Sequence, residues 1–202
     1  MFSEFASNRD PTCLLAARGF RLSGCVLTIG AFDGVHRGHQ QLVRRTVASA
    51  RRQGLPAVIY TFDPPPKVFF GRARALISLE EKLGRLGALE PDLIVVAAFD
   101  DACQRRTAME FIADLGLLNP RPIWVGDDFR FGAGQAGDVG LLTRYFSVRT
   151  LGPVQCEGGQ VISSSRIRRL LDGGELSAAE ALQGWQGLKL DGAATLAGGG
   201  CV

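Results

Sequence analysis

The two histidines of the chain, His36 and His39, lie three residues apart in the segment FDGVHRGH. This segment follows an apolar run, residues 24–30, which is typical of a buried strand that ends at Gly30. A helix that begins here presents free N–H groups and the positive end of its dipole, and both attract phosphate. Two imidazoles one turn apart share a face and can donate hydrogen bonds to phosphoryl oxygens. The segment therefore predicts a phosphate-binding turn; the alternative is two surface histidines that cap a helix.

A second polar cluster, ISSSRIRR, lies far along the chain at residues 162–169. Serines at the start of a helix cap it and leave hydroxyl and N–H groups facing an anion. Arg168 follows Ser165 by three residues, so its guanidinium can reach the same phosphates. The alternative is an ordinary capped basic helix.

Two loops carry groups that could bind the parts of a ligand other than its phosphates. In FDPPP, residues 62–66, three prolines stiffen the loop and are expected to exclude a helix, and they hold Asp63 where it could bind a ligand hydroxyl or a metal. In DDFRFG, Asp128 stands beside Phe129 and Phe131, and aromatic rings in a polar loop suit stacking on a flat ring. The alternatives are a plain rigid turn and an aromatic plug beneath a loop.

Two common kinds of nucleotide-binding site, the P-loop and the dinucleotide-binding loop, are not expected. No GxxxxGK[ST] is present, which excludes P-loop chemistry. GAGQAG, residues 132–137, matches the GxGxxG spacing, but a dinucleotide-binding loop must follow its strand directly. Here DDFRF intervenes, so a NAD-type site is not predicted.

The elements that must position these residues alternate between strand and helix. Buried strands are predicted at 24–30, 55–62, 91–99, 121–126 and near 147–151, and helices at 39–54, 81–90, 107–118, 139–146 and 175–184. This alternation predicts an α/β fold with a doubly wound, mostly parallel open sheet. The segments FDGVHRGH, FDPPP and DDFRFG follow predicted strands, at the edge where such sheets bind ligands. We expect one domain over residues 1–184 and a flexible C-terminal tail over 185–202.

Composition narrows the class of protein. The 202 residues are 46% hydrophobic and 21% charged, which suits one globular domain. Residues 1–75 carry 11 basic and 4 acidic residues, and 20 of the 23 cations in the whole chain are Arg, whose fork suits phosphate. A phosphorylated ligand near the N-terminal half is one explanation, and a compositional preference for Arg is the other. The formal charge of +3 is mild, and nucleic acid is not an expected partner.

The apolar runs are too short to span a bilayer, and the first residues do not form a secretory signal. None of the five cysteines lies within four residues of another, so a zinc site or a disulfide framework is not expected. We therefore expect a cytoplasmic protein without membrane contact. The oligomeric state stays open.

Together, TIGAFDGVHRGH, FDPPP, VGDDFRFGAGQAGD and ISSSRIR resemble, in order and spacing, the adenylyltransferase module of bacterial bifunctional riboflavin kinase/FAD synthetases. This family is a branch of the HxGH nucleotidyltransferases, and the resemblance covers residues 24–184. It implies a Rossmann-like fold and a reaction in which the phosphate of FMN attacks the α-phosphorus of Mg-ATP to give FAD and pyrophosphate. Mg²⁺ would enter with ATP, and no residue is assigned as its ligand.

The resemblance also implies roles for single residues. His36, His39 and Arg168 would be catalytic; Gly30, Phe32, Gly38, Ser164 and Ser165 would bind ATP; and Asp63, Asp128, Phe129 and Phe131 would bind the flavin.

Three positions depart from the family pattern. Ala31 replaces an Asn, Pro65 replaces a His, and Ser165 replaces a Thr. The residues after 184 leave no room for the kinase barrel of the family, so we expect no riboflavin kinase activity and FMN from another source. Two other hypotheses stay open: a related HxGH enzyme with another phosphorylated acceptor, and a flavin- or nucleotide-binding protein without catalysis.

Overall fold

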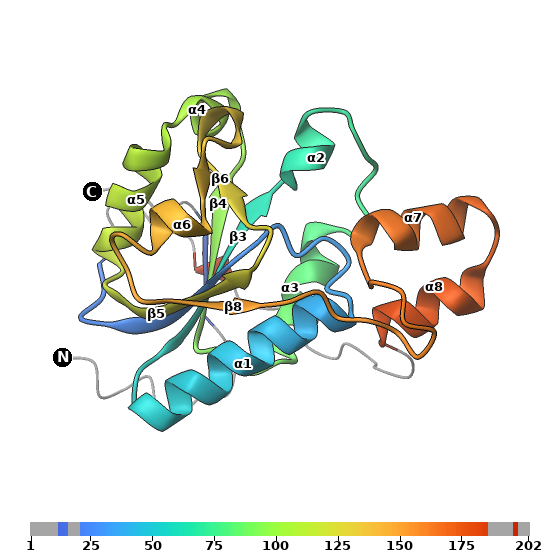
Figure 1. The fold of residues 1–202 in the computed structure, drawn as a ribbon, viewed down its shortest axis with the longest axis horizontal. Coiled ribbons are helices and arrows are strands. Elements are labelled where there is room, and N and C mark those ends of the chain that lie inside the picture. Colours follow the sequence, from blue (N-terminus) through green and yellow to red (C-terminus); the bar gives the residue numbers. More distant parts are fainter. Residues whose placement is uncertain (1–11, 16–20, 186–195, 198–202) are drawn as a thin grey trace.

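A parallel seven-stranded sheet forms the centre of the molecule (Figure 1). The computed structural model describes residues 12–15, 21–185 and 196–197. Strand order is β8-β5-β2-β3-β4-β1-β9, and every pair of neighbours is parallel. The strands are β1 (Thr12–Leu15), β2 (Cys25–Ile29), β3 (Ala57–Asp63), β4 (Leu93–Ala98), β5 (Pro120–Gly126), β8 (Val148–Leu151) and β9 (Leu196–Ala197). The predicted α/β class and its open parallel sheet are confirmed.

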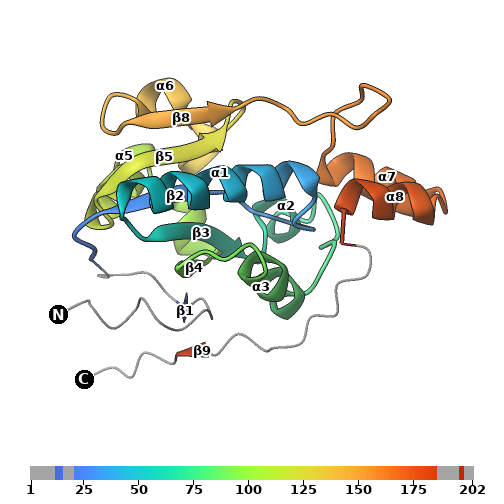
Figure 2. The same ribbon diagram turned by 90° about the horizontal axis from the view of Figure 1, so that it is seen from below.

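Helices cover both faces of this sheet. They are α1 (Arg37–Gln53), α2 (Pro66–Phe69), α3 (Leu79–Gly87), α4 (Asp101–Arg105), α5 (Ala108–Leu117), α6 (Val139–Leu142), α7 (Ser164–Asp172) and α8 (Leu176–Gln183). Figure 2 shows the strands from β8 at the top to β9 at the bottom, with α1 lying in front of β2. Every described helix is too short or too polar to span a bilayer.

Side chains along the central strands alternate between two cores. Leu27 and Val95 pack with the residues of α5 and α6, whereas Ile59 and Ile94 pack with the residues of α1 and α3. All five residues of β2 are buried. A parallel sheet that is covered on both faces requires such continuous apolar strands.

Strand order also explains where a ligand can bind. The chain runs from β2 to β3 and β4 on one side, and β5 then returns to the other side of β2. Ligands of open α/β sheets bind beyond the carboxyl ends of the strands at such a reversal. The segments FDGVHRGH, FDPPP and DDFRFG follow β2, β3 and β5 at this edge, as predicted.

Several local predictions need correction. A helix, α2, begins at Pro66, although the three prolines were expected to exclude one, because proline suits the first position of a helix, where no N–H partner is needed. Helix α1 begins at Arg37, two residues before the predicted start. The predicted loop 127–138 contains a short antiparallel pair, β6 (Arg130–Phe131) and β7 (Gly137–Asp138), and a 3-10 turn, η1 (Ala133–Gln135).

The ends of the chain also differ from the prediction. Strand β1 lies in a segment for which no element was predicted, and β9 pairs with β1 within the predicted tail. Trp185 donates a hydrogen bond to the backbone oxygen of Val35 at 2.7 Å, so the packed chain extends one residue beyond the predicted boundary. The remainder of the predicted tail lies outside the described residues.

A capping box at the start of α5 provides a test of the fold. The Thr107 hydroxyl accepts from the N–H of Glu110, and the Glu110 carboxylate accepts from the N–H of Thr107. Replacing Thr107 with Ala removes one cap, which costs about 1 kcal/mol. For a domain of this size, the melting temperature should fall by about 2–4 °C. Met109→Ala is the control, because Met109 is an exposed residue of the same helix. Equal melting temperatures for the two variants would contradict the role of the cap.

Candidate active site

The turn between β2 and α1 has an unusual backbone. Phe32 and Val35 have φ angles of 46° and 42°, in the left-handed region that side chains rarely adopt. Gly34 has a φ of 83° between them. Such conformations cost about 1–3 kcal/mol each and persist only where the surroundings enforce them. Phe32 and Val35 are fully buried, which fixes the turn.

The carbonyl groups of this turn bind donors from the rest of the protein. Five side chains from β3, α3, α1 and two distant segments donate hydrogen bonds of 2.7–3.3 Å to these carbonyl groups. The acceptors are the backbone oxygens of Ala31 (from Thr61), Gly34 (from Arg85), Val35 (from Gln40 and Trp185) and Asp33 (from Ser164). The N–H groups of Arg37 and Gly38, in the first turn of α1, have no hydrogen-bond partner among the described residues. The turn therefore leaves donors, not acceptors, at the start of the helix, which suits an anion.

The two histidines form one stacked unit at this helix start. His36 is the N-cap of α1, and its Nδ1 accepts from the N–H of His39 at 3.4 Å. The neutral His36 ring therefore carries its proton on Nε2. The two rings stack with centroids 3.6 Å apart, and the edge of His39 meets Phe32 at 5.3 Å. Gly38 allows this arrangement, because a Cβ there would lie 3.2 Å from the His36 ring.

Burial keeps both rings neutral. It lowers the pKa of His36 to about 4. Burial, and then the neighbouring His36, lowers the pKa of His39 well below its usual value. The Nδ1 atom of His39 is buried and has no hydrogen-bond partner among the described residues. Near pH 7 these rings are hydrogen-bonding groups without charge, and a bound polyanion would raise both pKa values.

A buried carboxylate joins this turn to the distant serine and arginine cluster. The side chain of Asp33 is only 6% exposed and forms an ion pair with Arg168, which is 135 residues away in sequence. The other oxygen of Asp33 accepts from the N–H of Leu76 at 2.9 Å. The hydroxyl of Ser164 also donates to the backbone oxygen of Asp33 at 2.9 Å. The starts of α1 and α7 therefore lie side by side, as Figures 1 and 2 show.

A basic cavity of about 380 Å³ opens beside this junction. It is lined by Pro66, Lys67, Phe70, Arg72, Ala73, Gln135, Ser165 and Arg168. The Lys67 ammonium lies 3.5 Å from the Ser165 hydroxyl. Cationic and hydroxyl groups from α2, the loop that follows it and α7 meet here, so the cavity suits phosphate groups.

An aromatic cavity of about 420 Å³ adjoins the basic one. The two share Pro66, Phe70, Arg72 and Gln135. Six phenylalanines from different segments line the aromatic cavity: Phe62, Phe70, Phe99, Phe111, Phe129 and Phe131. This lining suits a planar ring, and the continuity of the cavities suits a planar ring that carries phosphate.

The predicted flavin residues occupy different positions. Phe129 and Phe131 line the aromatic cavity and stack at 5.6 Å, although Phe131 is also buried in the core. Both rings therefore pack against the core and also line the cavity, and their stacking on a bound ring stays a prediction. Asp128 is exposed and lines neither cavity, and Asp63 at the end of β3 lines neither. The GAGQAG segment contains η1 and the first residue of β7, and it follows the short strand β6 and not a strand of the parallel sheet.

The residues predicted to bind ATP and those predicted to be catalytic divide into residues that build the β2–α1 turn and residues that line the basic cavity. Gly30 packs beneath the Phe32 ring, and a Cβ there would lie 3.1 Å from it. Ser165 and Arg168 line the basic cavity, whereas His36 and His39 line neither cavity.

Sequence reasoning missed Asp33, Lys67, Arg72 and Lys82. Asp33 stands inside the FDG motif, and this single acidic residue between apolar neighbours was a signal that could have been used. Lys67 and Lys82 are two of only three lysines in a chain that otherwise uses Arg.

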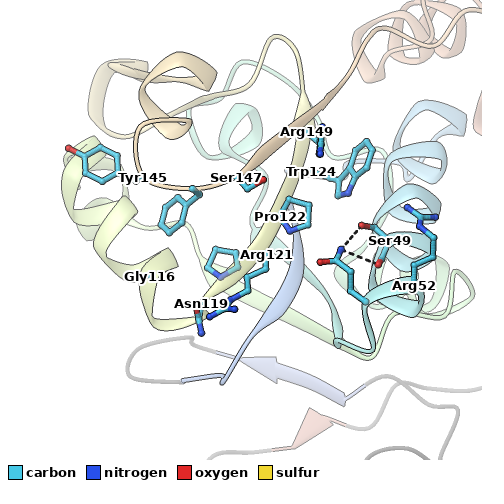
Figure 3. Close-up of a pocket in the computed structure, with 13 residues that line it drawn as sticks. Ser49, Arg52, Gly116, Asn119, Arg121, Pro122, Trp124, Tyr145, Ser147 and Arg149 are labelled. Atoms are coloured by element: carbon cyan, nitrogen blue, oxygen red, sulfur yellow. Dashed lines mark hydrogen bonds between the residues drawn. The ribbon is translucent and has the colours of Figure 1, made fainter.

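A larger cavity, of about 860 Å³, lies elsewhere (Figure 3). It lies between the end of α1, with Ser49 and Arg52, and strands β5 and β8, with Trp124 and Arg149. None of the motif residues lines it. Size alone therefore does not locate the candidate site. Within the described residues, no group of three or more His, Cys, Asp or Glu side chains is placed to hold a metal ion.

The histidine environment predicts a pH dependence of stability. Unfolded histidine has a pKa near 6.5, so between about pH 6.5 and pH 4 the unfolded chain binds more protons than the folded chain. The free energy of unfolding should therefore fall as the pH falls through this window, by about 3 kcal/mol from His36. His36→Asn keeps a capping acceptor but cannot titrate. Denaturant unfolding of both proteins at several pH values should show a shrinking advantage of the wild type toward pH 4; parallel curves would contradict the buried neutral ring.

The chain also matches known proteins. The FAD synthetase family model matches residues 20–166. A protein of Geobacillus thermodenitrificans, named as a bifunctional riboflavin kinase/FMN adenylyltransferase, is 48% identical over 170 residues, which cover 84% of this chain and 95% of that protein. The Escherichia coli K12 bifunctional riboflavin kinase/FMN adenylyltransferase is 41% identical over 170 residues, with 80% of this chain and 54% of that protein covered. The chain thus spans about half the length of the second relative.

A solved structure shares the fold. It is titled as a macrolide-efflux protein from Streptococcus pneumoniae, with a TM-score of 0.76, 29% identity, and coverage of 86% of this chain and 62% of that chain. Only the fold follows from this likeness. The family model and the identity to these relatives agree, and the chain belongs to the FAD synthetase family.

Proposed function

We propose that the protein is an FMN adenylyltransferase, a nucleotidyltransferase that transfers AMP from Mg-ATP to FMN and releases FAD and pyrophosphate. One observation carries this proposal. The Asp33–Arg168 ion pair brings the starts of α1 and α7 together, beside a basic cavity that continues into an aromatic one. A triphosphate, a second phosphate and a flat ring are the parts of the two substrates that this arrangement suits.

The reaction requires positioning and charge stabilisation more than acid–base chemistry. An oxygen of the FMN phosphate attacks the α-phosphorus of ATP, and the bond from that phosphorus to the oxygen that bridges to the β-phosphate breaks. The attacking phosphate is already ionised near pH 7, so no proton has to be removed from it. The enzyme must hold the two phosphates in line and stabilise the charge on the leaving pyrophosphate.

Each part of the site has a place in this scheme. His36 and His39 donate hydrogen bonds to the ATP phosphates and to the transition state, and Gly30, Phe32 and Gly38 shape the turn that holds them. Ser164, Ser165 and Arg168 bind the β- and γ-phosphates that leave.

The flavin side of the scheme uses the aromatic cavity. The isoalloxazine ring lies among its phenylalanines, with Phe129 and Phe131 in contact, and its phosphate points toward Lys67 and Arg72. Asp63 at the end of β3 and Asp128 in the loop after β5 bind polar groups of the flavin.

Magnesium enters with ATP as part of the substrate. Mg²⁺ keeps most of its water and phosphate ligands and takes few from a protein.

The direct test is the reaction itself. The purified protein is incubated with ATP, FMN and Mg²⁺, and FAD and pyrophosphate are measured by chromatography and a coupled assay. Equal amounts of the two products are expected. Riboflavin in place of FMN is the control and should give no FAD, because it lacks the attacking phosphate. A panel of other phosphorylated acceptors is run in parallel, and turnover of one of these without FAD formation would refute the proposal.

The His39 side chain predicts a kinetic effect. Replacing His39 with Ala removes a donor to the developing charge, so kcat should fall about 100-fold or more. The measurement is the steady-state rate of FAD formation, with the folded state checked by circular dichroism. A rate near that of the wild type would remove His39 from the mechanism.

Two adjacent arginines of α7 offer a matched comparison. Arg168 is paired with Asp33 and lines the basic cavity, whereas Arg169 is exposed and does not line it. Arg168→Ala should lower kcat/KM by about 100-fold, because the leaving pyrophosphate loses a cation. Arg169→Ala should stay within about twofold of the wild type, as expected for an exposed residue. Similar losses in both variants would argue for a general effect of charge on α7.

A further inference from the structure

Lys82 is a buried cation to which neither the fold nor the proposed reaction yet gives a role. Its side chain is 3% exposed, and it extends from α3 toward the end of β3. Its Nζ donates to the backbone oxygen of Phe62 at 2.6 Å and lies 4.0 Å from Oδ1 of Asp63. Removing an ammonium group from water costs several kcal/mol unless partners compensate for it.

The position of Lys82 on its helix makes this burial unusual. Its neighbours Leu83 and Leu86 are buried and pack in the core that covers β4. A leucine or methionine would continue this apolar face at no electrostatic cost. The fold alone therefore does not require a charge at this position. The groups that interact with the Lys82 ammonium explain the charge.

Two carboxylates act on this ammonium: Asp63, three residues before Pro66 of the basic cavity, and Asp33, the partner of Arg168. Burial lowers the pKa of Lys82, while Asp63 and, more weakly, Asp33 raise it. Asp33 already has Arg168 as its partner. For Asp63, whose side chain is 39% exposed, Lys82 is the one cation within ion-pair distance among the described residues.

An uncompensated carboxylate at this edge would oppose substrate binding. ATP and FMN both bring phosphate charge to the carboxyl ends of β2 and β3, and like charges at close range repel strongly where water is excluded. The hydrogen bond to Phe62 also fixes the backbone immediately before Asp63.

We infer that Lys82 is a positioning residue that holds and neutralises the Asp63 carboxylate, so that this edge of the sheet can accept the phosphates of both substrates. The inference rests on the proposed function, which it extends to a residue that touches neither substrate. Lys82 acts through Asp63 and the backbone of Phe62.

The test combines Lys82→Met, which has a similar volume and no charge, with Asp63→Asn. KM and kcat are measured for both substrates, and ATP binding is measured by calorimetry without FMN. Lys82→Met should raise the KM for ATP and the dissociation constant for ATP about tenfold or more, with a smaller change in kcat. Adding Asp63→Asn to Lys82→Met should recover at least half of the lost affinity on a logarithmic scale. Lys82→Arg, which keeps the charge, should lie closer to the wild type.

A purely structural role gives a different result. Lys82→Met would then lower thermal stability and kcat while the KM for ATP stays constant, and adding Asp63→Asn would restore no ATP affinity. Either an unchanged KM in the folded Lys82→Met variant or an absence of recovery in the double variant overturns the inference. If Lys82→Met does not fold, Asp63→Asn alone decides, because it leaves the Lys82 charge unopposed. ATP should then bind about threefold more tightly, and unchanged or weaker binding overturns the inference. Absence of FAD formation by the wild type would instead refute the proposed function, while the calorimetry still tests Lys82.

Discussion

The candidate site depends on one buried ion pair. The carboxylate of Asp33 binds the guanidinium of Arg168 and the N–H of Leu76, and its backbone oxygen accepts from Ser164. Buried ion pairs contribute little net stability, but the loss of one partner is costly because the other charge stays buried. The pair therefore fixes which segments meet more than it stabilises the fold. It holds α7 against the start of α1, where both helices present N–H groups and side-chain donors.

The parallel sheet supplies the second constraint. Because its strands run in one direction, the segments after β2, β3 and β5 all reach one edge. Cationic and hydroxyl groups gather beside the starts of α2 and α7, and aromatic groups gather between β3, β4 and β6. Pro66 and Phe70 border both cavities, so α2 and the residue that follows it place the boundary between the charged and the aromatic parts. One continuous site thus suits a ligand that carries both phosphate and a planar ring.

Local pattern predicted what local forces decide. The βα turn with His36 and His39, the capped start of α7 and the alternation of strands and helices all follow from motifs or periodicity within short windows. Contacts between distant segments cannot be predicted from patterns within short windows of sequence. Asp33 acquires its role from a partner 135 residues away, and Lys82 looks like a solvated helix residue until the end of β3 is placed beside it. The phenylalanines of the aromatic cavity are also apolar residues of strands and helices, so pattern alone predicts core positions for them. The helix at Pro66 differs from the expectation because proline breaks a helix in its interior but suits its first position.

Asp33 and Arg168 act as a unit that builds one phosphate site, so a double-mutant cycle on ATP affinity should reveal coupling between them. Dissociation constants are measured by calorimetry for the wild type, Asp33→Asn, Arg168→Ala and the double variant. The two substitutions should not be additive, with a coupling of about 1–3 kcal/mol, because each disrupts the same junction. Effects that add to within about 0.5 kcal/mol would show that the two residues influence ATP binding independently and do not form one site.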